Sequence, residues 1–190
     1  MKVIGLAGRP GSGKSAVASG LAKRPGVEWV DLDRLAWEVY APGTPGFARI
    51  VAAFGEGIVG RDGRIDRVEL GRIVFKDPRA RDKLERIVHP TLNERLSHLM
   101  KEHEEQGTEI LIVEGALIAS SPYVDRSAYD VVIWLEAPED IRRERLAAVG
   151  RGEQASRGRV IAPSAGAIVI DATGPIEEVA ARVWEAIAKV

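Results

Sequence analysis

Cysteine is absent from this sequence of 190 residues, and neither sign of charge is in clear excess. Without cysteine, the chain has no disulfide bond, no thiolate ligand for a metal and no cysteine nucleophile. Lys and Arg number 27, against 28 for Asp and Glu. So balanced a charge argues against a broad nucleic-acid-binding or membrane-binding surface, and we expect no partner of either kind.

Long apolar runs are absent too. The N-terminal run spans about six residues, which is too short for a signal peptide or a membrane-spanning helix. We therefore expect a soluble protein of the cytoplasm. The hydrophobic fraction of 45% is nevertheless typical of a globular protein with a real core. At this length we expect one domain, with at most a small appendage.

Short apolar segments predict the strands of a parallel sheet. Continuous apolar runs are typical of strands that are covered on both faces. The five predicted strands are residues 2–7, 27–32, 109–115, 129–137 and 167–172. Helical patterns follow several of them, at 14–24, 138–149 and 176–190. Strands that alternate with helices indicate an α/β fold with a parallel sheet.

A long helical block separates the second and third predicted strands. Apolar residues recur in it at helical spacing, and the turn Arg-Asp-Gly at 61–63 and Pro90 interrupt it. We expect an inserted helical subdomain over one edge of the sheet. The predicted division is a nucleotide-binding core of residues 1–33, 107–140 and 166–190, a helical acceptor-binding subdomain of residues 34–106, and a lid of residues 141–165.

The segment GRPGSGKS, residues 8–15, matches the phosphate-binding loop pattern G-x-x-x-x-G-K-[ST] and has a predicted strand before it and a helix after it. In that pattern the backbone N–H groups face a phosphate, the lysine reaches the β- and γ-phosphates, and the hydroxyl ligates Mg²⁺. The alternative is a glycine-rich turn that matches by chance. We expect a nucleoside triphosphate to bind at Gly8, Gly11, Ser12, Gly13, Lys14, Ser15 and Ala16, with Ser15 as a metal ligand.

Three acidic residues lie at or just after the ends of predicted strands. Asp31 and Asp33 come at the end of the second strand, and Glu114 comes at the end of the third. On an extended chain, residues two apart point the same way, and ligands bind beyond the carboxyl ends of parallel strands. The aspartate pair is open to three interpretations: a metal site, a catalytic base with a helper, or the cap of the following helix.

Clustered arginines suggest a lid that closes over phosphates. The Gly- and Ala-rich stretch 150–167 contains Arg151, Arg157 and Arg159, and Arg142 and Arg145 precede it. A solvated helix face is an equally good interpretation of Arg142. The sequence has no guanine-reading Asn-Lys-x-Asp segment, which argues against a GTPase, and a motor ATPase would be larger. A small-molecule kinase fits best.

Three segments, in order and spacing, resemble the dephospho-coenzyme A kinases: DLDRLAWEV at 31–39, FGEGIVGRDGRIDRVELGRIVF at 54–75 and LERIVHP at 84–90. The resemblance implies a P-loop NTPase fold, in which a three-layer, parallel five-stranded sheet carries an inserted helical substrate subdomain and a lid. It also implies ATP-dependent phosphorylation of the ribose 3′-hydroxyl of dephospho-CoA, the last step of CoA biosynthesis, with ATP and Mg²⁺ as cofactors.

The resemblance also implies roles for individual residues. Asp33 would be the catalytic base, with Lys14 and Arg145 as further catalytic groups. Asp31 would assist it through Mg²⁺-bound water or by orientation. Arg67, His89 and Glu114 would join the two aspartates in holding the acceptor, although His89 beside Pro90 is better explained as structural.

The C-terminal half departs from the family pattern. EGALIAS, residues 114–120, stands where the family has Pro-Leu-Leu-Phe-Glu, and Arg142 and Val149 replace a usual Gln and Arg, whereas Arg145 keeps its place. Two alternatives therefore stay open beside a dephospho-CoA kinase. One is another P-loop small-molecule or nucleoside kinase, and the other is a non-catalytic ATP- and CoA-binding protein with a decayed lid. A monomer is expected.

Overall fold

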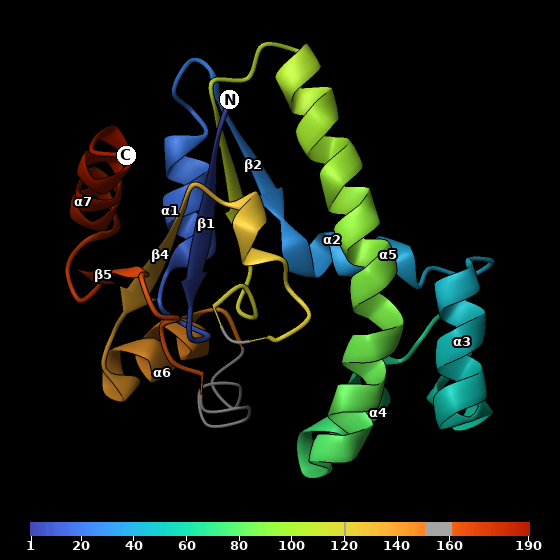
Figure 1. The fold of residues 1–190 in the computed structure, drawn as a ribbon. Helices are drawn as coiled ribbons and strands as arrows, with labels where there is room; N and C mark the ends of the chain where they lie inside the picture. Colours follow the sequence, from blue (N-terminus) through green and yellow to red (C-terminus); the bar gives the residue numbers. More distant parts are fainter. Residues whose placement is uncertain (120, 151–160) are drawn as a thin grey trace. The chain divides into compact units, whose positions relative to one another are not determined.

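The computed structural model describes residues 1–119, 121–150 and 161–190, and they form two compact units. One unit is Met1–Leu32 with Met100–Val190, and the other is Asp33–Leu99. The strands are β1 (Lys2–Gly8), β2 (Val27–Asp31), β3 (Ile110–Glu114), β4 (Val131–Glu136) and β5 (Ile168–Asp171) (Figure 1). The α-helices are α1 (Lys14–Leu21), α2 (Leu32–Val39), α3 (Pro45–Phe54), α4 (Arg67–Lys76), α5 (Pro78–Glu105), α6 (Glu139–Ala148) and α7 (Ile176–Ala188).

The sheet is five-stranded and entirely parallel, in the order β2-β3-β1-β4-β5, which confirms the predicted fold class. The chain runs from the first strand outward to β2, back to β3 and then across to β4. The strand order therefore reverses at β1, which lies between β3 and β4. In sheets of this type, ligands bind beyond the carboxyl ends of the strands at such a reversal.

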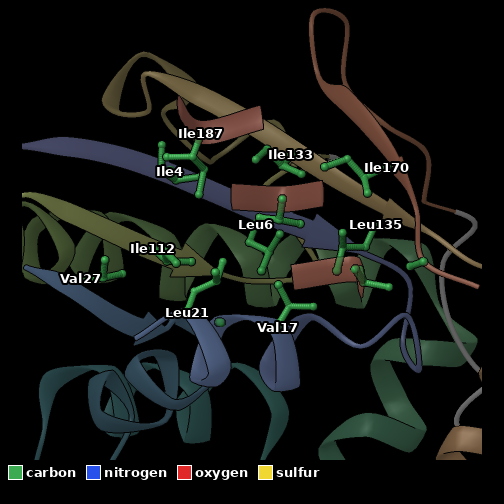
Figure 2. Packing of buried hydrophobic residues seen from close by; sticks show 14 of the residues in the cluster. Ile4, Leu6, Val17, Leu21, Val27, Ile112, Ile133, Leu135, Ile170 and Ile187 are labelled. Carbon is green, nitrogen blue, oxygen red and sulfur yellow. The ribbon is translucent and has the colours of Figure 1, made fainter. Parts of the chain in front are cut away.

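The core lies between the sheet and the helices α1 and α7. Ile4 and Leu6 of β1 pack against Val17 and Leu21 of α1, together with Ile187 of α7 and residues of the other strands (Figure 2). Full burial of a side chain of this size contributes about 1.5–3 kcal/mol. On the opposite face, Gly5 leaves room for Ile118 and Tyr129, whose atoms lie 3.2 Å from where a Cβ on Gly5 would be.

The second unit is built from helices with well-defined starts. The Oγ1 atom of Thr44 accepts a hydrogen bond from the N–H of Phe47 at 3.1 Å, so Thr44 caps α3. The carboxylate of Asp66 accepts bonds from the N–H groups of Val68 and Glu69, at 2.8 and 3.1 Å, and so caps α4. Each cap contributes about 1 kcal/mol. The assignment of this unit to acceptor binding stays a prediction.

The helix α5 spans 28 residues and includes Pro90. Across the described residues, each helix is too short or too polar to cross a membrane. The predicted lid arginines Arg151, Arg157 and Arg159 fall outside the described residues.

Candidate active site

The predicted phosphate loop connects β1 to α1, as the strand–loop–helix pattern requires. Gly13 stands at the N-cap of α1 with a φ of 95°, and no side chain caps this end of the helix. The first turn of α1 also contains no acidic residue. The N–H groups at this helix end therefore face the loop without a carboxylate, which suits a bound anion.

Gly11 allows the closest approach in the loop. A Cβ on Gly11 would lie 2.5 Å from the carbonyl oxygen of Arg142, and the φ of Gly11 is +82°. Both observations require glycine at this position. The loop therefore lies directly against α6, the helix that carries Arg142.

Lys14 is buried, and its ammonium group turns back over the loop. The Nζ atom donates to the carbonyl oxygen of Gly8 at 3.0 Å and to that of Arg9 at 3.4 Å. The positive charge is thus held against the backbone at the start of the loop. A phosphate group there would meet both the lysine and the end of α1.

The side chain of Ser15 is hydrogen-bonded to the last residue of β3. Its hydroxyl donates to Oε1 of Glu114 at 2.7 Å, and Glu114 is only 5% exposed. The β2–β3 register pairs Asp31 with Glu114, so two carboxylate residues end neighbouring strands at this edge of the sheet. Glu114 therefore orients the hydroxyl that the motif assigns to the metal.

These oxygen donors fit Mg²⁺, which takes oxygen ligands and is usually held by one or two protein groups together with phosphates and water. The described residues contain no cluster of three or more His, Cys, Asp or Glu that could hold a metal by itself. A hydroxyl beside a buried carboxylate is therefore the kind of site in which nucleotide phosphates complete the coordination. The hydroxyl of Ser12 is fully buried and makes no hydrogen bond to a described residue.

The two aspartates of the D-x-D pair belong to different elements. The strand β2 ends at Asp31, and α2 begins at Leu32, so Asp33 lies in the first helical turn. The expectation that both carboxylates project from one extended strand is therefore wrong. The helix forms because Leu32, Leu35 and Val39, at helical spacing, are all buried.

Arg142 is buried beneath the phosphate loop. Its side chain is 4% exposed, and it donates from Nε to the carbonyl of Ala137 and from NH1 to the carbonyl of Pro10, each at 3.2 Å. The interpretation as a solvated helix face is therefore wrong for Arg142, whereas the lid assignment of residues 141–165 stays a prediction. Arg142 instead connects the start of α6 to the loop, and a helical pattern alone contains no signal for this contact.

Arg145, one turn further along α6, lies beside the same loop. Its guanidinium donates to the carbonyl of Gly174 at 3.1 Å and approaches that of Ser12 at 3.5 Å. It also lines a pocket of about 420 Å³, together with Ile141, Glu144, Ala148, Thr173, Gly174 and Pro175. Arg145 is therefore close enough to the phosphate loop to serve a bound nucleotide.

In the second unit, Arg67 stacks on Trp37, with its Cζ atom 3.6 Å from the centroid of the indole. Both side chains line a pocket that also includes Tyr40. Burial raises the pKa of the Tyr40 hydroxyl, while Arg67 lowers it and Asp33 raises it further. The fold thus brings the predicted residues Asp33 and Arg67 to one locality, together with two aromatic residues that the sequence did not single out.

His89 lies elsewhere in this unit. It is 4% exposed, in the middle of α5, and Val88 and Leu92 beside it are also buried. Burial lowers the pKa of its imidazole, and the charge of Glu85 one turn earlier acts in the opposite direction. This environment supports the structural interpretation of His89.

Known proteins resemble this chain in sequence and in fold. The family described as dephospho-CoA kinase matches residues 2–159. The dephospho-CoA kinase of Thermobifida fusca is 40% identical over 193 residues, which cover 97% of this chain and 94% of that protein. The dephospho-CoA kinase of Frankia casuarinae is 39% identical over 196 residues, which cover 97% of this chain and 82% of that protein.

Two solved structures have a similar fold. The crystal structure of TT1252 from Thermus thermophilus gives a TM-score of 0.76 at 29% identity and covers 100% of this chain and 97% of its own. The dephospho-CoA kinase of Campylobacter jejuni gives a TM-score of 0.60 and covers 100% of this chain and 98% of its own. At 17% identity, the second match is a likeness of fold alone.

Proposed function

We propose that this chain, which belongs to the dephospho-CoA kinase family, transfers the γ-phosphoryl group of ATP to the ribose 3′-hydroxyl of dephospho-CoA, giving CoA and ADP. The observation that carries the proposal is the phosphate loop between β1 and α1, with its buried lysine and its serine bonded to Glu114. These contacts support a nucleoside triphosphate site of the kind that a kinase of this family needs.

On the ATP side, the N–H groups of the loop and Lys14 would hold the β- and γ-phosphates. Ser15 would ligate Mg²⁺, with Glu114 orienting its hydroxyl and Asp31 contacting the ion through water. When bound, Mg²⁺ would offset the negative charge of the phosphate oxygens. Support for this arrangement comes from the Ser15–Glu114 bond and from the pairing of Asp31 with Glu114 across β2 and β3.

On the acceptor side, Asp33 would act as the base. It would accept the proton of the 3′-hydroxyl while the oxygen of that hydroxyl bonds to the γ-phosphorus and the bond from phosphorus to the β-phosphate oxygen breaks. Lys14 and Arg145 would stabilise the charge on the transferred group. Support comes from the exposure of Asp33 in the first turn of α2, and from the proximity of Arg145 to the loop.

The test is an assay of ADP and CoA formation from ATP, Mg²⁺ and dephospho-CoA. We expect turnover by the unaltered protein, and we expect Asp33→Asn to lower kcat by about 10²–10⁴-fold with little change in ATP affinity. The matched control is Asp62→Asn, which changes an exposed acid of the same unit outside the proposed site. Turnover that survives in Asp33→Asn would show that Asp33 is not the base.

Two other outcomes would favour the alternatives. Turnover of a simple nucleoside, with none of dephospho-CoA, would indicate a different small-molecule kinase. Binding of ATP and dephospho-CoA without transfer would indicate a non-catalytic binding protein. We also propose that the enzyme is a cytoplasmic monomer, and light scattering from the purified protein would test the oligomeric state.

A further inference from the structure

A pocket of about 270 Å³ lies wholly within the unit Asp33–Leu99. Its lining combines two aromatic rings with three arginines and one acid: Trp37, Tyr40, Arg34, Arg64, Arg67 and Glu38. Three guanidinium groups outnumber the carboxylate of Glu38, even when that of Asp33, next to Arg34 on α2, is counted with it, so the pocket has a net positive charge. A pocket of this composition suits a ligand that carries more than one negative charge.

Among these side chains, Arg67 is the one whose orientation best suits it to bind a phosphate. Its Cζ atom lies 3.6 Å from the centroid of the Trp37 ring, so the guanidinium stacks on the indole. Stacking fixes the plane of the guanidinium and leaves its N–H groups directed away from the ring. A planar fork held in this way can donate to two oxygens of a phosphate at once, and little side-chain entropy is lost when it does.

The pocket also lies beside the proposed base. Tyr40 lines it, and the charges of Arg67 and Asp33 both act on the hydroxyl of Tyr40. Asp33 precedes Trp37 by one turn of α2, so the two residues lie on the same face of that helix. An acceptor bound in the pocket would therefore present its nearest hydroxyl groups to Asp33.

We propose that the Trp37–Arg67 pocket binds the diphosphate of the acceptor nucleotide, with Arg67 as its main donor and Trp37 as the residue that positions Arg67. The proposal rests on the proposed function, because dephospho-CoA carries a diphosphate on the ribose that is to be phosphorylated. Anchoring this diphosphate would set the ribose beside Asp33. It would also give the enzyme a reason to reject a nucleoside, which offers the same hydroxyl without the charge.

The test measures acceptor binding directly, by calorimetry, with a non-hydrolysable ATP analogue saturating the phosphate loop. We expect Arg67→Gln to weaken the binding of dephospho-CoA by about 10- to 100-fold. Adenosine, which lacks the diphosphate, should bind weakly and equally to both proteins. Arg72→Gln, an exposed arginine of the same helix that pairs with Glu69, is the matched control and should bind dephospho-CoA normally.

Variants of Trp37 separate positioning from direct contact. Trp37→Phe keeps an aromatic face for Arg67, and we expect it to retain most of the affinity, whereas Trp37→Leu should lose about as much as Arg67→Gln. In the transferase assay, Arg67→Gln should raise the KM for dephospho-CoA and leave kcat and the KM for ATP nearly unchanged. Thermal melting of each variant would identify a loss of binding that is caused by misfolding.

Each outcome decides the proposal. Normal binding of dephospho-CoA by Arg67→Gln overturns it, and so does an equal loss for adenosine, because the pocket would then recognise the nucleoside. Full affinity in Trp37→Leu removes the positioning role. Binding that depends on Arg67 without any transfer would refute the proposed function and leave the pocket assignment intact, whereas transfer that is indifferent to Arg67 would do the reverse.

Discussion

We expect the buried side chain of Arg142 to stabilise the phosphate loop through its hydrogen bonds, and Arg142→Met tests this expectation. The variant keeps much of the side-chain volume but loses both bonds, to the carbonyls of Ala137 and Pro10. A hydrogen bond from a charged donor contributes about 1.5–3 kcal/mol to the free energy of unfolding. Methionine avoids the cost of burying a guanidinium group, which offsets part of the loss. We therefore expect the free energy of unfolding to fall by about 2–4 kcal/mol.

For a chain of this length, that loss corresponds to a decrease in Tm of about 5–15 °C. Because Arg142 bonds to Pro10 and its backbone carbonyl lies against Gly11, the loop should also loosen. We expect the KM for ATP to rise by about 10-fold, with a smaller change in kcat. Circular dichroism would measure the unfolding transition, and steady-state kinetics would measure the KM for ATP.

The neighbouring Arg143 is exposed on the same helix and provides the control. Arg143→Met should change the free energy of unfolding by less than about 0.5 kcal/mol. The reasoning would be refuted if Arg142→Met melted at the temperature of the unaltered protein and kept its KM for ATP. It would also be refuted if Arg143→Met lost as much stability as Arg142→Met.

Two further predictions concern Glu114 and His89. Glu114→Gln removes the charge beside Ser15, so we expect the Mg²⁺ concentration for half-maximal activity to rise by about 10-fold. An unchanged Mg²⁺ dependence would contradict the role of Glu114. The control is Glu109→Gln, which changes an exposed acid just before β3. Burial lowers the pKa of His89 below its ordinary value of 6.5, so the unfolded chain binds a proton more readily. The contribution of a neutral His89 to the free energy of unfolding is therefore complete above about pH 6.5, and it is lost as the pH falls toward the pKa of His89 in the folded state. Melting at pH 7 and pH 5 should show that His89→Gln weakens this dependence, whereas the exposed His98→Gln should leave it unaltered; an identical loss of stability at pH 5 in His89→Gln would exclude His89 as its source.

The sequence was sufficient to predict the sheet and the phosphate loop, because both depend on local patterns. Runs such as Ile110–Glu114 are continuous and apolar, which is typical of strands covered on both faces. The phosphate loop follows one of them and precedes a helix, so its motif fixed its structural context. The sequence also places Glu114 at the carboxyl end of its strand, where the phosphate loop begins, and the Ser15–Glu114 bond joins the two. It does not predict the strand order.

Contacts between distant segments were harder to predict. The position of Arg142 on α6 was visible, but its contact with Pro10 depends on how α6 packs against a loop 132 residues earlier in the chain. The stack of Arg67 on Trp37 likewise joins α4 to α2. Charged and aromatic side chains are common on helix surfaces, so neither residue type was by itself a signal of these contacts.

The boundary at Leu32 shows why the aspartate pair was misjudged and why its members differ. Leu32 fits both an extended continuation of β2 and the first position of a helix with Leu35 and Val39. In the folded chain Leu32 is buried against Gly115, and its atoms lie 3.1 and 3.2 Å from where a Cβ on Gly115 would be. Any larger residue at 115 would crowd this leucine. Asp31 therefore keeps the orientation set by sheet pairing with Glu114, whereas that of Asp33 is set by α2. Two carboxylates fixed by different elements can serve different reactants, which supports a metal-side role for Asp31 and an acceptor-side role for Asp33.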